Sequence, residues 1–268
     1  MTERRLRLFE NPFSPFARKV RMVLEYKGLA FDSVDGLHAS GRDALGEVNP
    51  RREVPVLVDG ETLVVNSSHI VAYLEEAYPE PAVLPGNASE RAAIREWERI
   101  ADSVLDPIIV DASLWTWANR HDSPPPGLRE AAARDLDSIY AALEQALARG
   151  GDFLCGPLSL ADIALFPNLY GARALRLGPD PSRFPKTIAW LKRLATRPPF
   201  AADLDRLRAW MKSLDGDAGL ERDRIFWRGE RIEWLLANGF HRWFLEEIEQ
   251  GRVLWPATSV RAPGPPSP

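Results

Sequence analysis

The stretch "YPEPAVLPG", residues 78–86, divides the chain into two parts with different hydrophobic patterning. Before it, short apolar runs rich in Val, Leu and Phe alternate with segments of helical period. After it, nearly every segment repeats apolar residues at steps of three and four, which is typical of amphipathic helices. We therefore expect an α/β domain followed by an all-helical domain.

The order of elements expected before residue 80 is β-α-β-α-β-β-α. A helix over residues 15–26 ends before Gly28, and "VPVLVDGETLVV" predicts a hairpin that turns at Asp59-Gly60. The other expected elements are strands over 4–10 and 31–34, a short polar helix, and a helix over 67–78. This order is typical of a small sheet with parallel and antiparallel strands, covered by helices.

Beyond the break, residues 89–120 predict one long helix that is interrupted or bent near Pro107. Ser159 and Asp162 form a variant capping box, in which Asp replaces Glu, at the start of another helix. Further helices are expected over 128–149, 184–196 and 200–214. This part of the chain is therefore predicted to be entirely helical.

Residues 215–268 form a third region, with a helix-compatible pattern interrupted near Asn238-Gly239 and an unusual number of aromatic residues. So many aromatic side chains need burial. Three uses are open: a lid over a substrate pocket, a dimer contact, or packing behind the helical domain. The last residues, "RAPGPPSP", are expected to be disordered. The predicted domains are therefore 1–80, 89–214 and 215–268.

Composition narrows the classes of partner. A net charge of −4 over 268 residues argues against a nucleic-acid-binding protein. The chain shows no signal-peptide pattern and no apolar run long enough for a membrane span, so a cytoplasmic protein without a membrane partner is expected. The four histidines lack metal-ligand spacing, which predicts no metal. The single cysteine, Cys155, excludes an internal disulfide and is expected to be a small core residue.

Four segments in order carry a family resemblance: "SPFARKVRMVLEYKGL", "NPRREVPVLVDG", "LVVNSSHIVAYLEEAYP" and "LSLADIALFP". With the helical spacing between them they cover residues 4 to about 214, and the chain resembles a cytosolic glutathione transferase. The resemblance implies a thioredoxin-like N-terminal domain that binds glutathione. It also implies an all-helical C-terminal domain for the acceptor substrate, and a homodimer.

Ser14 has two interpretations. A Ser at the N-cap followed by Pro at the first helical position is what any helix start prefers. Glutathione, however, reacts as a thiolate, and a free thiol with a pKa of about 8.5 is only a few per cent ionised at neutral pH. A hydroxyl that donates a hydrogen bond at a helix N-terminus stabilises the anion. In the context of the four segments, Ser14 is the predicted catalytic donor, neither a nucleophile nor a base.

The same position indicates a subclass. Omega-type relatives carry a cysteine there that suits thiol transfer, whereas this chain resembles the plant tau-like and many bacterial transferases with serine. The first strand contains no tyrosine that would take the activating role, as in the alpha, mu and pi classes. The Ser-Ser-Cys-type segment of the zeta isomerases is absent, which disfavours that interpretation.

The resemblance also implies the residues that hold glutathione. Val54 would pair its main chain with the cysteinyl part through a cis bond to Pro55, and Asn66 with Ser67 would hold the γ-glutamyl end. The rest of the predicted set is Phe16, Arg18 and Arg52.

Two positions depart from the family pattern. Asn66 brings no charge to the γ-glutamyl amine, and Glu53 stands where tau-like relatives carry Lys, so that its carboxylate would repel the glycyl carboxylate. An arginine at 51, 52, 18 or 42 is expected to compensate.

The acceptor pocket is predicted to include Phe13, Trp115 and Trp117, and therefore to suit an apolar or aromatic electrophile. Two residues apart on a helix, Trp115 and Trp117 do not share a face, so at least one should pack in a core or an interface. Two functions are weighed: a detoxifying enzyme in which thiolate attack gives conjugation, ether cleavage or dehalogenation, and a non-catalytic glutathione-transferase-fold binding or interaction protein.

Overall fold

The computed structural model describes residues 6–214 and 219–255. A four-stranded sheet is formed by β1 (Leu6–Glu10), β2 (Phe31–Asp35), β3 (Val56–Asp59) and β4 (Thr62–Val65) in the order β2-β1-β3-β4. β1 and β2 are parallel, and the other neighbouring pairs are antiparallel. The predicted mixed sheet is confirmed. The hairpin between β3 and β4 turns at Gly60 and Glu61, one residue later than predicted.

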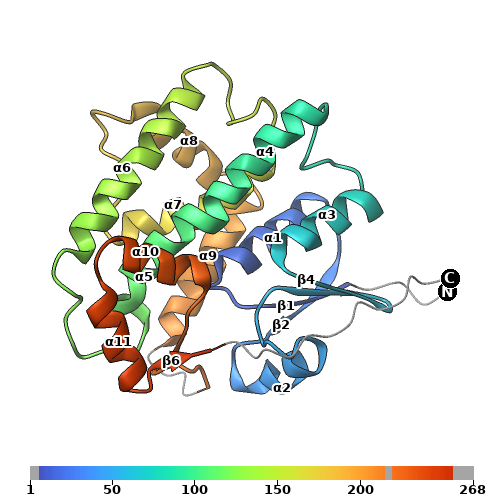
Figure 1. The fold of residues 1–268 in the computed structure, drawn as a ribbon. Helices are drawn as coiled ribbons and strands as arrows, with labels where there is room; N and C mark the ends of the chain where they lie inside the picture. Colours follow the sequence, from blue (N-terminus) through green and yellow to red (C-terminus); the bar gives the residue numbers. More distant parts are fainter. Residues whose placement is uncertain (1–5, 215–218, 256–268) are drawn as a thin grey trace. The chain divides into compact units, whose positions relative to one another are not determined.

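Helices cover both faces of this sheet. α1 (Pro15–Tyr26) and α3 (Ser67–Ala77) pack together on one face, and α2 (Ala39–Val48) lies on the other (Figure 1). Leu45 of α2 clusters with Phe9 and Val56, which are partners across β1 and β3. Because successive strand residues point to opposite faces, Leu8 and Leu57 point away from α2, and both are fully buried. The two central strands, β1 and β3, are therefore covered on both faces of the sheet.

Chain contacts divide the protein into two compact units. The first contains the described residues of 1–84 and 197–221, and the second contains 85–196 and 222–255. By these contacts α9 (Phe200–Ser213) groups with the first unit, and its Asp203 forms an ion pair with Arg18 of α1.

The second unit begins with the long helix predicted over 89–120. It consists of α4 (Ala88–Ile100), a π-helical turn η1 (Ala101–Leu105) and α5 (Asp106–Trp117). The π turn ends two residues before Pro107, which has no N–H to donate to the ladder, so the predicted interruption is confirmed. The remaining helices of this part are α6 (Leu128–Leu147), α7 (Leu160–Ala174) and α8 (Pro185–Ala195).

The predicted capping box at the start of α7 is present. The Asp162 carboxylate accepts from the Ser159 main-chain N–H at 3.0 Å. It also accepts from the indole N–H of Trp190 in α8 at 2.8 Å. The cap therefore links two helices in addition to starting one.

The aromatic-rich region folds onto the helical unit. It contains β5 (Ile225–Phe226), α10 (Gly229–Ala237), α11 (His241–Glu249) and β6 (Val253–Leu254), with β5 and β6 parallel. Trp227 and Phe244 join a buried cluster with Leu114 of α5 and Leu128 of α6. The chain turns between α10 and α11 at Gly239, whose φ is 83°, where the interruption was predicted. Of the three uses considered, packing behind the helical domain is the one observed for residues 222–255. The two short strands were not predicted.

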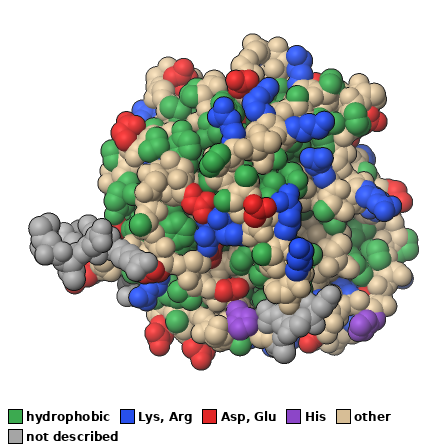
Figure 2. Space-filling view, turned by 180° about the vertical axis from the view of Figure 1, so that it is seen from behind, with side chains coloured by type: hydrophobic (Ala, Val, Ile, Leu, Met, Phe, Trp, Pro, Cys, Tyr) green, Lys and Arg blue, Asp and Glu red, His purple; other side chains and the backbone are tan. Residues whose placement is uncertain are grey.

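Some expectations fall outside the described part of the chain: the start of the first strand, residues 215–218 and the terminal "RAPGPPSP". Within residues 6–214 and 219–255, no helix is both long and apolar enough to cross a membrane. On the face drawn in Figure 2, acidic and basic side chains lie interspersed among apolar ones, which is a mixed-sign surface and not a continuous basic one.

Candidate functional site

Three segments that carry predicted site residues adjoin the sheet at the same end of its strands. Phe9 of β1 pairs with Val56 of β3, and Val56 pairs with Val65 of β4. Neighbouring strands lie about 4.8 Å apart. The loop after β1, the Val54-Pro55 turn before β3 and the start of α3 after β4 are therefore adjacent. The strand register thus brings Ser14, Val54 and Ser67 into one site, although they lie far apart in the sequence.

Ser14 is the N-cap of α1. Its hydroxyl oxygen accepts a hydrogen bond from the Ala17 main-chain N–H at 3.4 Å, and its own N–H donates to the Asn11 carbonyl at 3.0 Å. The side chain is half-buried, and no acceptor for its hydroxyl proton is found among the described residues. Capping uses a lone pair of the oxygen and leaves the O–H able to donate. The two interpretations of Ser14 are therefore compatible.

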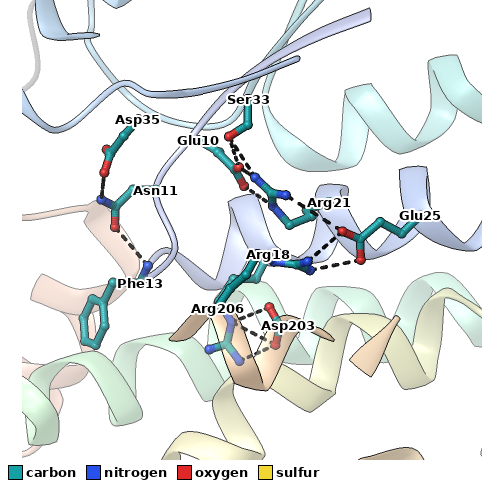
Figure 3. Close-up of polar contacts among 10 residues, drawn as sticks. All are labelled: Glu10, Asn11, Phe13, Arg18, Arg21, Glu25, Ser33, Asp35, Asp203 and Arg206. Atoms are coloured by element: carbon teal, nitrogen blue, oxygen red, sulfur yellow. Dashed lines mark hydrogen bonds and ion pairs between the residues drawn. The ribbon is translucent and has the colours of Figure 1, made fainter. Parts of the chain in front are cut away.

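The loop that carries Ser14 is ordered by a half-buried polar contact that was not predicted from the sequence. The Asn11 amide donates to both carboxylate oxygens of Asp35, at 3.0 and 3.2 Å, and its carbonyl oxygen accepts from the Phe13 N–H at 2.9 Å (Figure 3). Asp35 also accepts from the N–H groups of Leu37 and His38. One carboxylate at the end of β2 thus orders two loops. Asn before Pro is a signal for an Asx turn that identifies Asn11 from sequence, but nothing local points to Asp35.

The Val54–Pro55 bond is cis, as the resemblance implied. Within the described ranges, the main-chain N–H and C=O of Val54 have no hydrogen-bond partner. The loop before Val54 is stabilised by a side-chain contact, because the Asn49 amide donates to the Glu53 carbonyl at 2.9 Å. An extended peptide could therefore pair with Val54 as an added strand would.

The charge of Glu53 is offset by its neighbour. Arg51 Nε lies 2.8 Å from Glu53 Oε2, and this hydrogen bond raises the pKa of Arg51 above its ordinary value. Of the four arginines considered, Arg51 is the one paired with Glu53. Arg42 instead donates to the Leu37 carbonyl at 3.1 Å.

Asn66 and Ser67 occupy the start of α3. Asn66 has a φ of 76° and a ψ of 131°, and its side-chain oxygen accepts from the Ser68 N–H at 3.0 Å. A non-glycine residue with positive φ costs energy and persists where the surrounding fold holds it, often at a binding site. Ser67 is the first helical residue, and its N–H is one of the unpaired donors of a helix N-terminus, which favours an anion.

The other predicted glutathione residues have different surroundings. Phe16 is buried in the first turn of α1, and Arg52 is exposed on the loop before Val54, with a φ of 52°. The Arg18 side chain is 5% exposed and forms a bidentate pair with Asp203, with N–O distances of 2.6 to 3.2 Å. This placement argues against a glutathione role for Arg18, because its guanidinium is already committed to a buried carboxylate.

The three predicted acceptor-pocket residues lie in two different units. Phe13, in the first unit, stacks on Trp210 of α9. In the second unit, Trp115 and Trp117 both pack against the aromatic cluster of the C-terminal region. The Trp117 indole donates to Ser113 at 3.1 Å. The expectation that at least one of the two tryptophans serves packing is therefore met by both.

Burial, together with the nearby charge of Asp162, raises the pKa of the Cys155 thiol to about 11. This thiol stays protonated at neutral pH and does not suit disulfide exchange. Among the described residues, no group of three or more His, Cys, Asp or Glu side chains is arranged to hold a metal ion.

The four-stranded sheet with its flanking helices, followed by a series of helices, is a thioredoxin-like domain joined to a helical domain. Residues 8–82 match the model of the glutathione S-transferase N-terminal domain, and residues 126–213 match that of the C-terminal domain. The chain belongs to the glutathione S-transferase family of enzymes.

Individual relatives support this assignment. The chain is 31% identical over 186 residues to a zeta-class glutathione S-transferase of Euphorbia esula, and the match covers 68% of this chain and 81% of the relative. It is 30% identical to a probable maleylacetoacetate isomerase of Vibrio cholerae, and that match covers 70% of this chain and 90% of the relative. A solved structure of a glutathione S-transferase from Rhodospirillum rubrum F11 is 27% identical with a TM-score of 0.66, covering 74% and 91%. Zeta-type proteins are thus among the relatives, although the absence of the Ser-Ser-Cys segment disfavoured that type.

Proposed function

We propose that this protein activates the thiol of glutathione with Ser14 and directs the thiolate to an apolar or aromatic electrophilic carbon. The observation that carries the proposal is the N-cap geometry of Ser14, in which the hydroxyl oxygen caps α1 and the hydroxyl proton is left to donate. Both the hydrogen bond and the positive end of α1 favour a negative sulfur at this point.

The energetic requirement is modest. A shift of the bound thiol from a pKa of about 8.5 to below 7 needs roughly 2 kcal/mol of preferential interaction with the anion, at about 1.4 kcal/mol for each unit. A hydrogen bond to a charged group contributes about 1.5–3 kcal/mol. One well-placed hydroxyl at a helix N-terminus is therefore sufficient without a general base.

The adjacent loops supply the proposed binding contacts. The main-chain N–H and C=O of Val54, which have no partner among the residues that the structure describes, pair with the cysteinyl backbone, and the N-terminus of α3 at Ser67 receives the γ-glutamyl carboxylate. Asn66 accepts from the γ-glutamyl ammonium without adding charge, so we expect this contact to be weaker than a carboxylate would make. Arg52, exposed beside Val54, meets the glycyl carboxylate.

The proposed reaction balances without a cofactor. The sulfur lone pair forms an S–C bond while the leaving group, a halide or an aryl oxide, departs with the bonding electrons. The thiol proton passes to water or to the departing oxygen. The three outcomes considered from sequence, conjugation, ether cleavage and dehalogenation, all follow this scheme. The protein is further proposed to act in the cytoplasm, in detoxification, as a homodimer.

Isomerisation is a second candidate, favoured by the 30% identity to a probable maleylacetoacetate isomerase. In that case the thiolate would add to the substrate and be expelled again, so that glutathione is not consumed. A transferase consumes one glutathione for each turnover. Measuring the loss of free thiol during the reaction separates the two.

The test is calorimetric binding of glutathione by the wild type and by Ser14→Ala, with the pH dependence of thiolate ultraviolet absorbance in the bound state. We expect both proteins to bind, with the thiol ionising below pH 7 in the wild type and near its free value in the variant. Asn87→Ala is the matched control, because Asn87 caps α4 by the same kind of contact in the other unit. It should leave thiol ionisation unchanged.

Two results would count against the proposal. Equal ionisation in wild type and Ser14→Ala would reduce Ser14 to a helix cap. Absence of glutathione binding by the wild type at millimolar concentration would favour the non-catalytic binding protein.

A further inference from the structure

We propose that a hollow on the second unit binds a small phosphomonoester with an apolar body. The hollow has a volume of about 400 Å³ and is formed by the C-terminal end of α7, the loop over residues 175–184 and helix α8. This inference goes beyond the proposed function and does not depend on it, because the hollow belongs to the second unit and Ser14 belongs to the first.

Cationic side chains line the hollow without a counter-charge. They are Arg173, Arg176 and Lys192. None of the three forms an ion pair with a described residue, and none of the described residues that line the hollow is acidic. Nearby Arg183, by contrast, pairs with Asp137. Although the whole chain carries a net charge of −4, this hollow is therefore positive and attracts an anion.

The helix ends account for two of these cations. Arg173 and Lys192 lie in the last turns of α7 and α8, where a cation interacts favourably with the negative end of the helix dipole. Arg176 lies beyond the last turn of α7, so the dipole does not require its side chain.

The backbone at Arg176 favours glycine. The Arg176 N–H donates to the Arg173 carbonyl at 3.1 Å, and the Leu177 N–H donates to the Ala172 carbonyl at 2.8 Å. These two hydrogen bonds define a Schellman motif, and Arg176, with a φ of 57°, occupies the position that is usually glycine. Because the backbone would be relaxed with glycine, the arginine is explained by what its side chain binds.

Contacts from α6 hold this loop in place. The Arg129 guanidinium donates to the Leu175 and Arg176 carbonyls, both at 3.0 Å. The Tyr140 hydroxyl donates to the Leu177 carbonyl at 2.7 Å. The turn that carries Arg176 is therefore ordered before any ligand binds.

The rest of the hollow is largely apolar. Its wall includes Pro179, Ile188 and Leu191, of which Pro179 and Leu191 are buried. A Cβ added at Gly178 would lie 3.0 Å from Cγ of Arg173, so the loop backbone packs directly against the Arg173 side chain. A ligand that fills the hollow thus meets cations on one part of its surface and an apolar wall on another.

These features favour a phosphate over a carboxylate. A phosphomonoester carries a charge of about −1.5 to −2 at pH 7 and three strong acceptor oxygens. Each arginine can donate two parallel hydrogen bonds to such oxygens, whereas the lysine acts as a point charge. A single carboxylate would balance only one of the three cations. The apolar wall receives the ring or alkyl part of the ester.

The experiment is calorimetric titration of the full chain with phenyl phosphate, and with inorganic phosphate and benzoate as comparison probes. The variants are Arg176→Gly and Arg173→Gln. Arg176→Gly introduces the residue that the backbone prefers, so it should keep the fold, which thermal unfolding checks. Arg149→Gln is the matched control, because Arg149 is exposed on the same unit, does not line the hollow and loses the same charge.

We expect Arg176→Gly and Arg173→Gln each to weaken phenyl phosphate binding about 10-fold, and Arg149→Gln to weaken it less than about 2-fold. Benzoate should bind about 5- to 10-fold more weakly than phenyl phosphate, because it carries less charge. Inorganic phosphate should also bind more weakly, because it lacks the apolar body.

Four results would overturn the inference. They are no binding of phenyl phosphate by the wild type at millimolar concentration, equal weakening by Arg176→Gly and Arg149→Gln, benzoate binding as tight as that of phenyl phosphate, and displacement of phenyl phosphate by glutathione. None of the four bears on thiol activation by Ser14, and a failure of Ser14→Ala to change thiol ionisation would leave this site unaffected.

Discussion

Two buried arginine–carboxylate pairs, one in each unit, connect the C-terminal helices α9 and α11 to earlier parts of the chain. In the first unit, Arg18 of α1 holds Asp203 of α9, with both side chains at most 5% exposed. In the second, Arg120, just after α5, holds Glu247 of α11 at 2.5 and 2.9 Å. Both connect residues more than a hundred positions apart, so neither is a local helix interaction.

The surroundings of the two pairs differ. Arg120 also donates to Asp122 and lies over the rings of Trp115 and Trp243, at 5.0 and 5.6 Å from their centroids. Glu247 has a second partner in Arg252. The Arg120 pair is therefore part of a network around both of its members, whereas Asp203 holds Arg18 by a bidentate contact in which both side chains are at most 5% exposed. Removing one carboxylate should cost more in the first unit than in the second.

The largest effect is expected for Asp203→Ala. Truncation leaves the Arg18 guanidinium buried without its carboxylate, which lowers the free energy of unfolding by about 3–5 kcal/mol. Chemical denaturation of the full chain measures this change. Asp205→Ala on the same helix is the control, since Asp205 is exposed and pairs only with nearby Arg208 among the described residues. An equal loss in both variants would contradict the special role of the buried pair.

A smaller loss is expected for Glu247→Ala, about 1.5–3 kcal/mol. Asp122 and the two tryptophan rings remain around Arg120 and compensate in part. The same denaturation experiment applies, with exposed Glu246→Ala on α11 as the control. A loss as large as that of Asp203→Ala would show that the network lacks the redundancy inferred from its contacts.

The Arg120 network also predicts a pH dependence. Burial opposes ionisation of Glu247, but hydrogen bonds and charge from Arg120 and Arg252 outweigh it and hold the pKa below the ordinary 4.5. The folded state then binds fewer protons, so this contribution to the free energy of unfolding is complete above pH 4.5 and is lost as pH falls through the folded pKa. The stability difference between wild type and Glu247→Gln should therefore shrink below pH 4.5. A constant difference would mean that Glu247 does not titrate as expected.

The smallest effect is expected for Asp137→Asn. Arg183 meets Asp137 with distances of 2.5 and 2.7 Å, as close as either buried pair, but the two side chains are 57% and 39% exposed. Solvent screens such pairs, so thermal unfolding should stay near that of the wild type. A loss comparable to that of Glu247→Ala would show that geometry, and not burial, sets the strength of these pairs.

Local features of the site followed from sequence. The bounds predicted for α1 match the structure, and Ser14 caps it as expected, because caps and apolar spacing act within a few residues. The cis Val54–Pro55 turn and the start of α3 at Ser67 also lie where the family resemblance put them. The contribution of Asp35 was not predictable, because its contact with Asn11 spans 24 positions.

The sequence by itself determined the order of elements in the first domain, the caps at Ser14 and Ser159, and the segments that carry Ser14, Val54 and Ser67. The tertiary structure alone decided that α9 contacts α1, that Arg18 pairs with Asp203 and that Trp210 stacks on Phe13. The physical reason is the distance along the sequence over which each kind of interaction acts. Propensity and periodicity act between near neighbours, whereas the partner of a buried charge or ring is chosen only when segments far apart in the chain pack together.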